Sequence, residues 1–507
     1  MHHCSFRLAK LPILHPLTSN FTTWRSLVPV KKAFIGGEWV TGSSRKTFPV
    51  YNPSTEALIT EVPALTSTEV NAAVSSAAEA QKTWAAKTAG ERAFVIRRWA
   101  DVLRAQTPLL AELITTENGK VDSDARGEIA SAIAALEWYA EEAKRTYGCI
   151  IPSTSIPNRR LLVNYQPVGV VAMITPWNFP LSMITRKAGA ALAAGCSVVL
   201  KPADETPLTA LAAAFLATTE AGMDGRLLNV VTVPAGPAGA EMVGNIFCSH
   251  PLIRQIGFTG STQVGKKLYT AAAAHMKRAT LELGGNAPFI VFESADLPKA
   301  VDQLVASKFR CSGQTCICAN RILVQESIYD QFVLLLTESV SKLKFGVHQG
   351  PLINKTALNK VSKLVESAIS EGAVPTIGGK PVSDDRKGFF YPPSVLRNCT
   401  PTMACGREEI FGPVAPIISF RTEDEALEIA NSTPYGLAGY MFSRDTAQCW
   451  RVAEGLQAGL VGVNSGIVST PEAPFGGVKQ SGIGREGGPH ALTEFMDVKY
   501  VCWADIN

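Results

Sequence analysis

Short runs of β-branched and other apolar residues alternate with helix-forming stretches through the middle of this chain of 507 residues. The runs are Val170–Ile174, Val198–Leu200, Leu228–Val231, Gln255–Phe258 and Phe289–Val291. This alternation is typical of parallel strands, because a parallel connection needs a crossover that a helix can supply. We therefore predict an α/β fold in which helices cover both faces of a parallel sheet.

The residues that follow these runs are candidates for a binding site, because parallel sheets bind ligands beyond the carboxyl ends of their strands. The first, second and fourth runs are followed by Thr175-Pro176-Trp177-Asn178, Lys201-Pro202-Ala203-Asp204 and Thr259-Gly260-Ser261. Gly260 and Ser261 can begin a helix whose free N–H groups face a phosphate. Taken alone, such a glycine pattern is more often an ordinary turn.

The part of the chain before this alternation is predicted to form a hairpin and four helices. The hairpin covers Phe34–Trp39, and the second and third helices cover 91–104 and 109–117. Thr66 and Glu69 have the spacing of a capping box at the start of the first helix. In the fourth helix, apolar residues recur every three or four positions from Ile129 to Tyr147, so we expect it to end at Gly148.

Cys316 is the first candidate for a catalytic nucleophile. It lies within Phe309–Arg321, where small and polar residues can leave a thiol accessible. Most cysteines only fill space in the core, so this assignment needs partner residues elsewhere in the chain. The eleven cysteines include no Cys-x-x-Cys pair, which predicts a reducing compartment and no metal site.

The net charge of +4 comes from the N-terminal segment. The first 37 residues contain no Asp or Glu and carry Arg7, Lys10, Arg25, Lys31 and Lys32. The rest is nearly neutral, so we expect no nucleic-acid partner, and no apolar run is long enough for a membrane span. We interpret residues 1–32 as a mitochondrial presequence that directs the protein to the matrix, the alternative being an unstructured tail.

Five motifs in order resemble the aldehyde dehydrogenase superfamily over about residues 33–505. They are Pro176–Pro180, Glu282–Gly285, Gly313–Cys316, Glu409–Pro413 and Pro474–Glu486. The resemblance implies a Rossmann-type NAD-binding domain (33–150 and 168–282) and an α/β catalytic domain (283–483). It also implies a small β oligomerisation element (151–167 and 484–507) and a homodimer or homotetramer, with Arg160–Pro167 and a final strand at Val498–Trp503 extending a neighbour's sheet.

The resemblance also implies a catalytic set. The Cys316 thiolate would attack an aldehyde, so we expect its surroundings to lower the thiol pKa. The Asn178 amide and the Cys316 N–H would hold the oxyanion. Glu282 would be the general base that hydrolyses the thioester. Glu486 matches a position proposed to relay protons, but a structural salt bridge is an equal alternative.

For the cofactor, the resemblance implies NAD. Lys201 and Asp204 would meet the adenosine ribose, where a carboxylate accepts hydrogen bonds from a 2′-hydroxyl and repels a 2′-phosphate. Glu409 would hold the nicotinamide ribose, and Phe411 would pack beside the ring. The remaining residues implied at this site are Thr175, Pro176, Trp177, Gly260, Ser261 and Leu283.

For the substrate, the resemblance implies a small carboxylated aldehyde. It puts Arg186 and Arg310 at the mouth of the substrate tunnel with Ser469 opposite, and paired guanidinium groups suit a carboxylate. The surrounding motifs are most similar to the succinate-semialdehyde branch of the superfamily. Glutarate semialdehyde stays open, because one methylene discriminates by only about 1–3 kcal/mol. A catalytically silent binding protein on the same fold is the other alternative.

Cys318 raises a hypothesis of redox regulation. In an extended segment, residues two apart face the same side, so Cys316 and Cys318 could form a disulfide that removes the nucleophile. The alternative is an inert packing thiol. Cys311 stands where the superfamily often has asparagine, and it adds a third thiol nearby.

Overall fold

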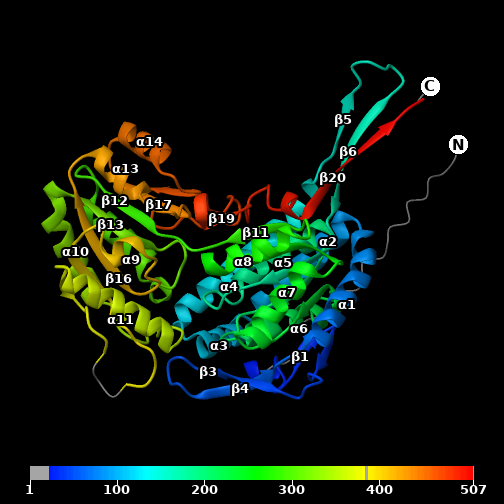
Figure 1. Cartoon of the computed structure of the whole chain (residues 1–507), viewed down its shortest axis with the longest axis horizontal. Helices are drawn as coiled ribbons and strands as arrows, with labels where there is room; N and C mark the ends of the chain where they lie inside the picture. The colour runs from blue at the N-terminus through cyan, green and yellow to red at the C-terminus, as the bar shows by residue number, and fades with distance from the viewer. Residues whose placement is uncertain (1–21, 383–385, 506–507) are drawn as a thin grey trace.

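The computed structural model describes residues 22–382 and 386–505. It has two lobes, each built on a β-sheet covered by helices, and an arm that projects from one of them (Figure 1). The sheets have eight and seven strands, and the arm is a sheet of three strands. The predicted α/β class is confirmed.

Five parallel strands form the centre of the eight-stranded sheet, in the order β11, β10, β7, β8, β9. Their bounds are β7 (Val170–Ile174), β8 (Ser197–Lys201), β9 (Leu228–Val230), β10 (Ile253–Thr259) and β11 (Arg278–Glu282). Three short antiparallel strands complete the edges: β1 (Ala33–Ile35), β2 (Glu38–Val40) and β19 (Gly482–Ile483). The order reverses between β7 and β10, which is where open α/β sheets bind ligands.

The alternation predicted one sheet for all five runs, and this was wrong for Phe289–Val291, which the resemblance assigns to the separate catalytic domain (283–483). The run does form a strand, β12 (Ala287–Val291), but β12 lies in the seven-stranded sheet of the other lobe. The residues between Glu282 and Ala287 carry the chain from one sheet to the other. A buried parallel strand has the same sequence pattern in either sheet, so the pattern could not reveal this change of lobe.

Helices cover both faces of the first sheet. They are α1 (Ser67–Ala85), α2 (Ala89–Ala105), α3 (Thr107–Asn118), α4 (Asp122–Glu142), α5 (Ser182–Ala194), α6 (Pro207–Thr219), α7 (Met242–Ser249) and α8 (Thr262–Ala273). The predicted hairpin at β1 and β2 and the capping box of Thr66 and Glu69 are both present. The predicted end of the fourth helix was wrong: α4 ends at Glu142, and Tyr147 is exposed, because the chain turns there into strand β5 (Cys149–Pro152) of the arm.

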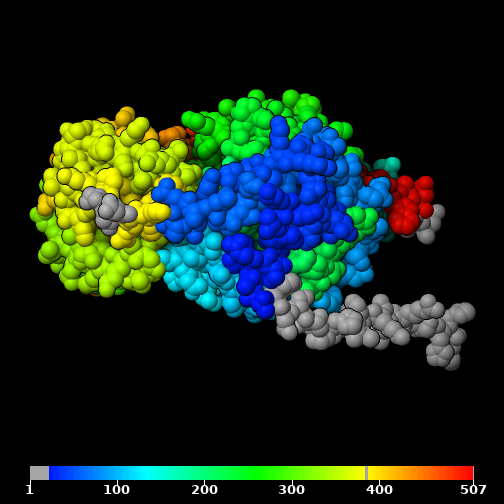
Figure 2. All heavy atoms as spheres, turned by 90° about the horizontal axis from the view of Figure 1, so that it is seen from below, coloured from blue at the N-terminus to red at the C-terminus, as the bar shows by residue number. Residues whose placement is uncertain are grey.

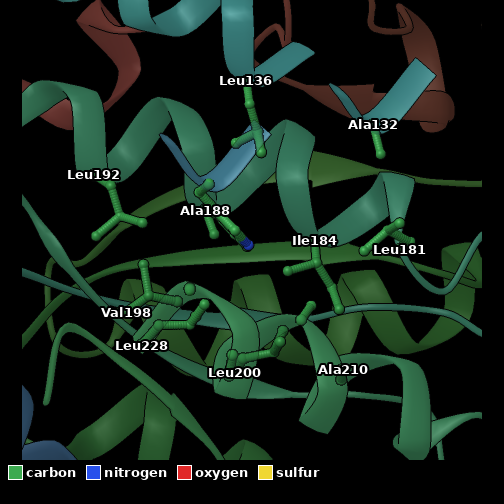
Figure 3. Close-up of a cluster of buried hydrophobic side chains, with 14 of the residues drawn as sticks. Ala132, Leu136, Leu181, Ile184, Ala188, Leu192, Val198, Leu200, Ala210 and Leu228 are labelled. Atoms are coloured by element: carbon green, nitrogen blue, oxygen red, sulfur yellow. The ribbon is translucent and has the colours of Figure 1, made fainter. Parts of the chain in front are cut away.

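Helix α5 lies between helix α4 and the sheet (Figure 3). The core there is made of small and branched apolar side chains from three layers: Ala132 and Leu136 on α4, Leu181, Ile184, Ala188 and Leu192 on or next to α5, and Val198, Leu200 and Leu228 on the strands. Their burial fixes the start of α5, and with it the loop between β7 and α5 that carries Asn178.

The second lobe has a sheet in the order β14, β15, β16, β13, β12, β17, β18. Besides β12, the bounds are β13 (Ala319–Gln325), β14 (Val374–Ile377), β15 (Ser394–Cys399), β16 (Val414–Phe420), β17 (Ala438–Phe442) and β18 (Leu460–Val463). Its helices are α9 (Leu297–Lys308), α10 (Tyr329–Ser341), α11 (Lys355–Ser370), α12 (Ala404–Arg407), α13 (Glu423–Asn431) and α14 (Thr446–Gly455). Separate apolar clusters pack on its two faces.

On the face shown in Figure 2, the second lobe (yellow to green) lies against the blue and cyan part of the first lobe. The hairpin of β3 (Thr47–Tyr51) and β4 (Leu58–Pro63) contributes to this contact, since the Phe389 N–H donates to the Pro53 carbonyl at 3.1 Å. The arm consists of β5 (Cys149–Pro152), β6 (Arg160–Pro167) and β20 (Met496–Trp503). The predicted final strand is therefore present.

Most of the segment interpreted as a presequence, residues 1–21, lies outside the described residues. The remainder is part of the fold. Trp24, Leu27 and Val28 are buried in the core of the first lobe.

Candidate active site

Cys316 lies between helix α9 and strand β13, in a turn rather than an extended segment. The turn is closed by the Cys318 N–H, which donates to the Thr315 carbonyl at 3.1 Å. The Tyr440 hydroxyl donates to the Ile317 carbonyl at 2.6 Å and holds the turn from the opposite side. The expectation of an extended segment at Cys316–Cys318 was therefore wrong. Cys316 is partly exposed, whereas Cys318 is buried.

Two cavities meet at Cys316, which lines both of them. We call the first the arginine cavity; it has a volume of about 280 Å³ and contains Arg186, Arg310 and Ser469. We call the second the switch-point cavity; it has a volume of about 540 Å³ and lies where the order of the first sheet reverses, between the ends of β7 and β10. A thiol at this position can react with molecules that enter from two sides.

The arginine cavity brings together the three residues predicted for the substrate. Arg186 is already engaged: its Nε lies 3.0 Å from Glu486 Oε2, and its guanidinium lies 4.0 Å from the centre of the Phe475 ring. Arg310 is exposed and forms no ion pair within the described ranges. Arg310 is therefore the better placed of the two to bind an added carboxylate.

The sequence did not indicate that helix α4 contributes to this cavity. Asp124, Glu128 and Ser131 line it, and the Asp124 carboxylate accepts a hydrogen bond from the Cys311 N–H at 2.9 Å. Cys311 itself lines the cavity and adopts a left-handed backbone with φ of +49°. Asparagine adopts this conformation more readily than cysteine, so the thiol stands at a position that suits asparagine.

Most residues predicted for a cofactor line the switch-point cavity. They are Pro176, Trp177, Gly260, Ser261, Leu283, Glu409 and Phe411. Ser261 caps helix α8, and its hydroxyl accepts from the Val264 N–H at 3.4 Å. The buried Thr259 hydroxyl lines the same cavity and has no hydrogen-bond partner in the described part of the chain. Free helix N–H groups and an unsatisfied hydroxyl fit a phosphate-bearing cofactor such as a dinucleotide.

Thr175, Lys201 and Asp204 do not line this cavity, although they were predicted to bind the cofactor. Thr175 and Lys201 are buried side by side, with the Thr175 N–H donating to the Lys201 carbonyl at 3.1 Å. Asp204 Oδ2 accepts from the Ala235 N–H at 3.2 Å. Lys201 ends β8 and Asp204 follows it, one strand away from the point where the sheet order reverses.

Asn354 and Lys360 also line the switch-point cavity and were missed by the sequence analysis. Asn354 caps helix α11, and its side-chain amide donates to Glu205 Oε1 at 3.2 Å. Burial, assisted by Asp204, raises the pKa of Glu205 to about 7. The sequence marks Asn354 only as an asparagine at the start of a helix, after Pro351-Leu352-Ile353. Asparagine is so common at helix starts that this position does not indicate a binding site.

Glu409 and Phe411 are held in unusual settings. Glu409 Oε1 accepts from the Gly285 N–H at 2.9 Å, and burial raises the pKa of Glu409 to about 7. Phe411 has φ of +56°, which is strained for a bulky side chain, and its ring meets the Trp177 ring edge-on at 5.6 Å. Strained backbone conformations of this kind occur most often at functional sites.

Asn178 and the Cys316 backbone provide two N–H donors beside the thiol. Asn178 Nδ2 donates one hydrogen bond to the Gln314 carbonyl at 2.9 Å, which leaves the second N–H of this amide available. The Cys316 N–H donates to no other described residue. Both residues line the switch-point cavity, so both donors can serve an oxygen atom bound next to the sulfur.

Glu282 ends strand β11 and is 4% exposed. Its Oε2 has no hydrogen-bond partner within residues 22–382 and 386–505. Burial, assisted by the charge of Glu486, raises the pKa of Glu282 well above its usual range, and Lys187 and Arg186 only partly oppose this shift. A carboxylate with a raised pKa is a stronger base than an ordinary carboxylate.

The expectation that the surroundings of Cys316 lower its pKa was wrong for the groups of the protein itself. Burial, together with the negative charges of Glu409 and Glu282, raises the pKa of the Cys316 thiol to about 12, while Arg186 opposes this shift. The thiol is therefore protonated at neutral pH and needs a base. Gly285 packs closely against the Cys316 backbone, since a Cβ on Gly285 would lie 2.5 Å from the Cys316 carbonyl oxygen.

Glu486 forms ion pairs with both Arg186 and Lys187. Burial acts to raise the pKa of Glu486, but these two cations outweigh it, and the net shift is downward. Glu486 is thus a charged carboxylate that contributes to the raised pKa of Glu282.

In the part of the chain that the structure describes, no group of three His, Cys, Asp or Glu side chains could hold a metal ion. No helix there is long and apolar enough to cross a membrane.

The sequence pattern of the aldehyde dehydrogenase family matches residues 39–501. A mitochondrial succinate-semialdehyde dehydrogenase of Arabidopsis thaliana is 52% identical over 482 residues, covering 94% of this chain and 90% of that protein. A glutarate-semialdehyde dehydrogenase of Pseudomonas putida is 46% identical over 478 residues, covering 93% of this chain and 97% of that protein.

Solved structures of three proteins are similar along nearly the whole chain. A succinate-semialdehyde dehydrogenase from Burkholderia pseudomallei has 45% identity and a TM-score of 0.91, covering 95% of this chain and 99% of that one. An NADP-dependent enzyme of E. coli has 45% identity and a TM-score of 0.91, covering 94% of this chain and 98% of that one. A betaine aldehyde dehydrogenase from Staphylococcus aureus in complex with NAD+ has 35% identity and a TM-score of 0.90, covering 94% of this chain and 95% of that one.

Proposed function

The chain belongs to the aldehyde dehydrogenase family, and on that premise we propose that it oxidises succinate semialdehyde to succinate with NAD through a thioester on Cys316. The observation that carries this proposal is the position of the Cys316 thiol at the junction of two cavities. A carboxylated aldehyde enters the arginine cavity, and the cofactor occupies the switch-point cavity.

The first step is attack of the Cys316 sulfur on the aldehyde carbon. A carbon–sulfur bond forms, and the carbonyl oxygen becomes an oxyanion held by the Asn178 amide and the Cys316 N–H. Because the thiol pKa is raised, the thiol gives up its proton to a water molecule or hydroxide ion as this bond forms. When bound, NAD supplies the acceptor for the hydride that the substrate carbon loses. Glu282 then activates the water that breaks the carbon–sulfur bond and releases the acid.

The assignment of NAD rests on two carboxyl groups beside Lys201, where the family resemblance puts the adenosine ribose. Asp204 and Glu205 lie next to each other, and Glu205 contacts Asn354 at the cavity wall. The negative charge of Asp204, joined by that of Glu205 when it loses its proton near pH 7, repels a 2′-phosphate. This argument is needed because relatives of comparable similarity include an NADP-dependent enzyme.

The substrate assignment rests on Arg310 and on the comparisons with succinate-semialdehyde dehydrogenases. Glutarate semialdehyde is the second candidate, because a relative at 46% identity carries that name. The test measures NADH formation with succinate semialdehyde, glutarate semialdehyde, acetaldehyde and betaine aldehyde. We expect the highest kcat/KM for succinate semialdehyde, and R310Q should lower it about 10²-fold without changing kcat/KM for acetaldehyde. Equal losses for both aldehydes would contradict the role of Arg310.

We also propose that the enzyme is a homo-oligomer and that it works in the mitochondrial matrix. The basic, acid-free N-terminus and the mitochondrial relatives support import. Because Trp24 and Leu27 are buried in the core, a removed leader should end before Trp24. N-terminal sequencing of protein isolated from mitochondria tests this boundary, and cleavage beyond Leu27 would contradict it.

A further inference from the structure

The loop that carries Asn178 is held by a buried polar cluster that the proposed reaction does not use. The cluster lies at the turn between helices α3 and α4. Lys120 Nζ donates to the Asn178 carbonyl at 2.7 Å, and the Asn118 side-chain amide donates to the Trp177 carbonyl at 2.9 Å. Two consecutive carbonyl groups of the loop are thus bound from one turn, and Asn118 and Lys120 are each 3% exposed.

Glu128 connects this cluster to the start of helix α5. One carboxylate oxygen lies 2.6 Å from Lys120 Nζ, and the other accepts from the N–H groups of Leu181 at 2.7 Å and Ser182 at 3.1 Å. The Lys120 ammonium also lies 4.2 Å from the centre of the Phe179 ring. Every residue from Trp177 to Ser182 except Pro180 therefore contacts this cluster.

The turn itself has little freedom to move. Gly119 has φ of +84°, and a Cβ there would lie 2.7 Å from both Pro53 and Pro351. Pro351 belongs to the second lobe, next to the Gln314 side chain, whose Nε2 donates to the Pro351 carbonyl at 3.3 Å. The Gln314 carbonyl also accepts the hydrogen bond from the Asn178 amide. The backbone and the side chain of Asn178 are thus fixed by two segments that are themselves in contact.

We infer that Lys120, together with Asn118, is a positioning residue that sets the place of the Asn178 amide relative to Cys316. The inference rests on the oxyanion role proposed for Asn178. Lys120 Nζ binds both the Glu128 carboxylate and the carbonyl of the oxyanion residue, so one ammonium group connects the Asn178 loop to helix α4. Catalysis is sensitive to such placement, since a shift of about 1 Å can cost about 10²-fold in rate.

The experiment removes the ammonium group without leaving a buried charge unpaired. K120M alone would leave the Glu128 carboxylate without its partner, which is strongly destabilising. K120M/E128Q avoids this, and the side-chain oxygen of the introduced glutamine can still accept from the N–H groups of Leu181 and Ser182. N118L is a second variant that removes only a neutral donor. K277M is the matched control, because Lys277 Nζ also binds two backbone carbonyls, those of His250 and Ile253, but far along the chain from the Asn178 loop.

We expect K120M/E128Q to lower kcat about 10- to 100-fold, with KM for the aldehyde and the Kd for NAD changed less than about twofold. N118L should show the same pattern at smaller size, and K277M should keep wild-type kcat. In the N178A background, K120M/E128Q should cause no further loss, because residues that act through one group are not additive. A wild-type kcat in K120M/E128Q, or losses that multiply in N178A, would overturn the inference and leave the proposed function intact. A wild-type kcat in N178A itself would overturn both.

Discussion

The reactive sulfur of Cys316 is placed in surroundings that oppose its ionisation. Burial removes water from the thiolate, and Glu409 and Glu282 add negative charge nearby, so the pKa rises to about 12. Such a site keeps the nucleophile protonated until a base removes the proton.

The pH dependence of alkylation should reveal this shift. A raised thiol pKa means that the thiolate fraction of Cys316 is small near neutral pH and grows about tenfold per pH unit up to the pKa. In the NAD-free protein, we expect the rate of iodoacetamide labelling at Cys316 to rise continuously from about pH 7 to about pH 10. Peptide mass spectrometry resolves this site from the exposed Cys149 and Cys502, which serve as references on the same chain. A plateau for Cys316 near about pH 8 would contradict the shift.

The residue types of the candidate site could be predicted from the sequence, but their electrostatics could not. Cys316, Asn178 and Glu282 stand out because each lies in a recognisable motif. The thiol pKa depends instead on its burial and on how closely Glu409 and Glu282 approach from distant segments. Local sequence does not contain such distances. For the same reason, the contributions of Asp124 on α4 and Asn354 at α11 were missed.

At the scale of elements, the turn of residues 315–318 carries two thiols that differ in exposure. Cys316 is partly exposed, while Cys318 is buried and lies 3.8 Å from Lys308 Nζ. Peroxide would oxidise the Cys316 thiol to a sulfenic acid and release water. Attack by the Cys318 sulfur would then form the disulfide and release a second water molecule. We therefore propose that the pair is a reversible redox switch.

This switch predicts a specific phenotype for C318A. The variant should still be inactivated by peroxide, but thiol reductants should no longer restore its activity, because Cys316 then oxidises beyond the sulfenic state. C311A is the matched control, since Cys311 is a buried thiol that lines the same arginine cavity. We expect C311A to recover activity as the wild type does. Recovery of C318A to the same extent would exclude the switch.

The segment between β8 and α6 should determine the choice of cofactor. Asp204 and Glu205 place two carboxyl groups beside Lys201, and their charge disfavours a 2′-phosphate. D204S/E205Q should raise the ratio of kcat/KM for NADP to that for NAD about 10- to 100-fold, and the single variants should each give part of this change. Steady-state kinetics with both cofactors measure it. An unchanged ratio would show that another part of the site determines the choice of cofactor.

The elements themselves were largely predictable, and the exceptions have physical causes. Strands β7 to β10 and the N-terminal helices follow the apolar pattern closely. The end of α4 and the membership of β12 do not, because both depend on where the chain leaves one packed layer for another. Apolar periodicity indicates that a residue is buried but not which partner buries it.

At the scale of the whole molecule, the arm is the part that lacks a covering layer. Seven of the eight residues of β20 are exposed, among them Val498, Tyr500 and Trp503. An apolar strand of this kind is usually covered by another subunit. We propose that the arm pairs with a neighbour's sheet to form a dimer or tetramer.

Charges on the arm should break this assembly. V498D/Y500D should reduce the molar mass in solution to that of a monomer, because it buries two carboxylates in the proposed interface. Light scattering after size-exclusion chromatography measures the mass. L334D is the matched control, since Leu334 on α10 is 69% exposed and lies on the other lobe. A variant V498D/Y500D that keeps the wild-type mass would contradict the proposed interface.

The proposed reaction depends on both lobes, because Glu282 ends a strand of one sheet and Cys316 precedes a strand of the other. The variant E282Q separates thioester formation on Cys316 from the hydrolysis that Glu282 assists. It should form the thioester but hydrolyse it about 10²–10⁴-fold more slowly. Intact-protein mass spectrometry of E282Q mixed with NAD and succinate semialdehyde is the most direct test. We predict that one succinyl group accumulates per chain on Cys316 and is absent in C316A/E282Q. An unmodified E282Q chain after NADH has formed, or a succinyl group on another residue, would contradict the account.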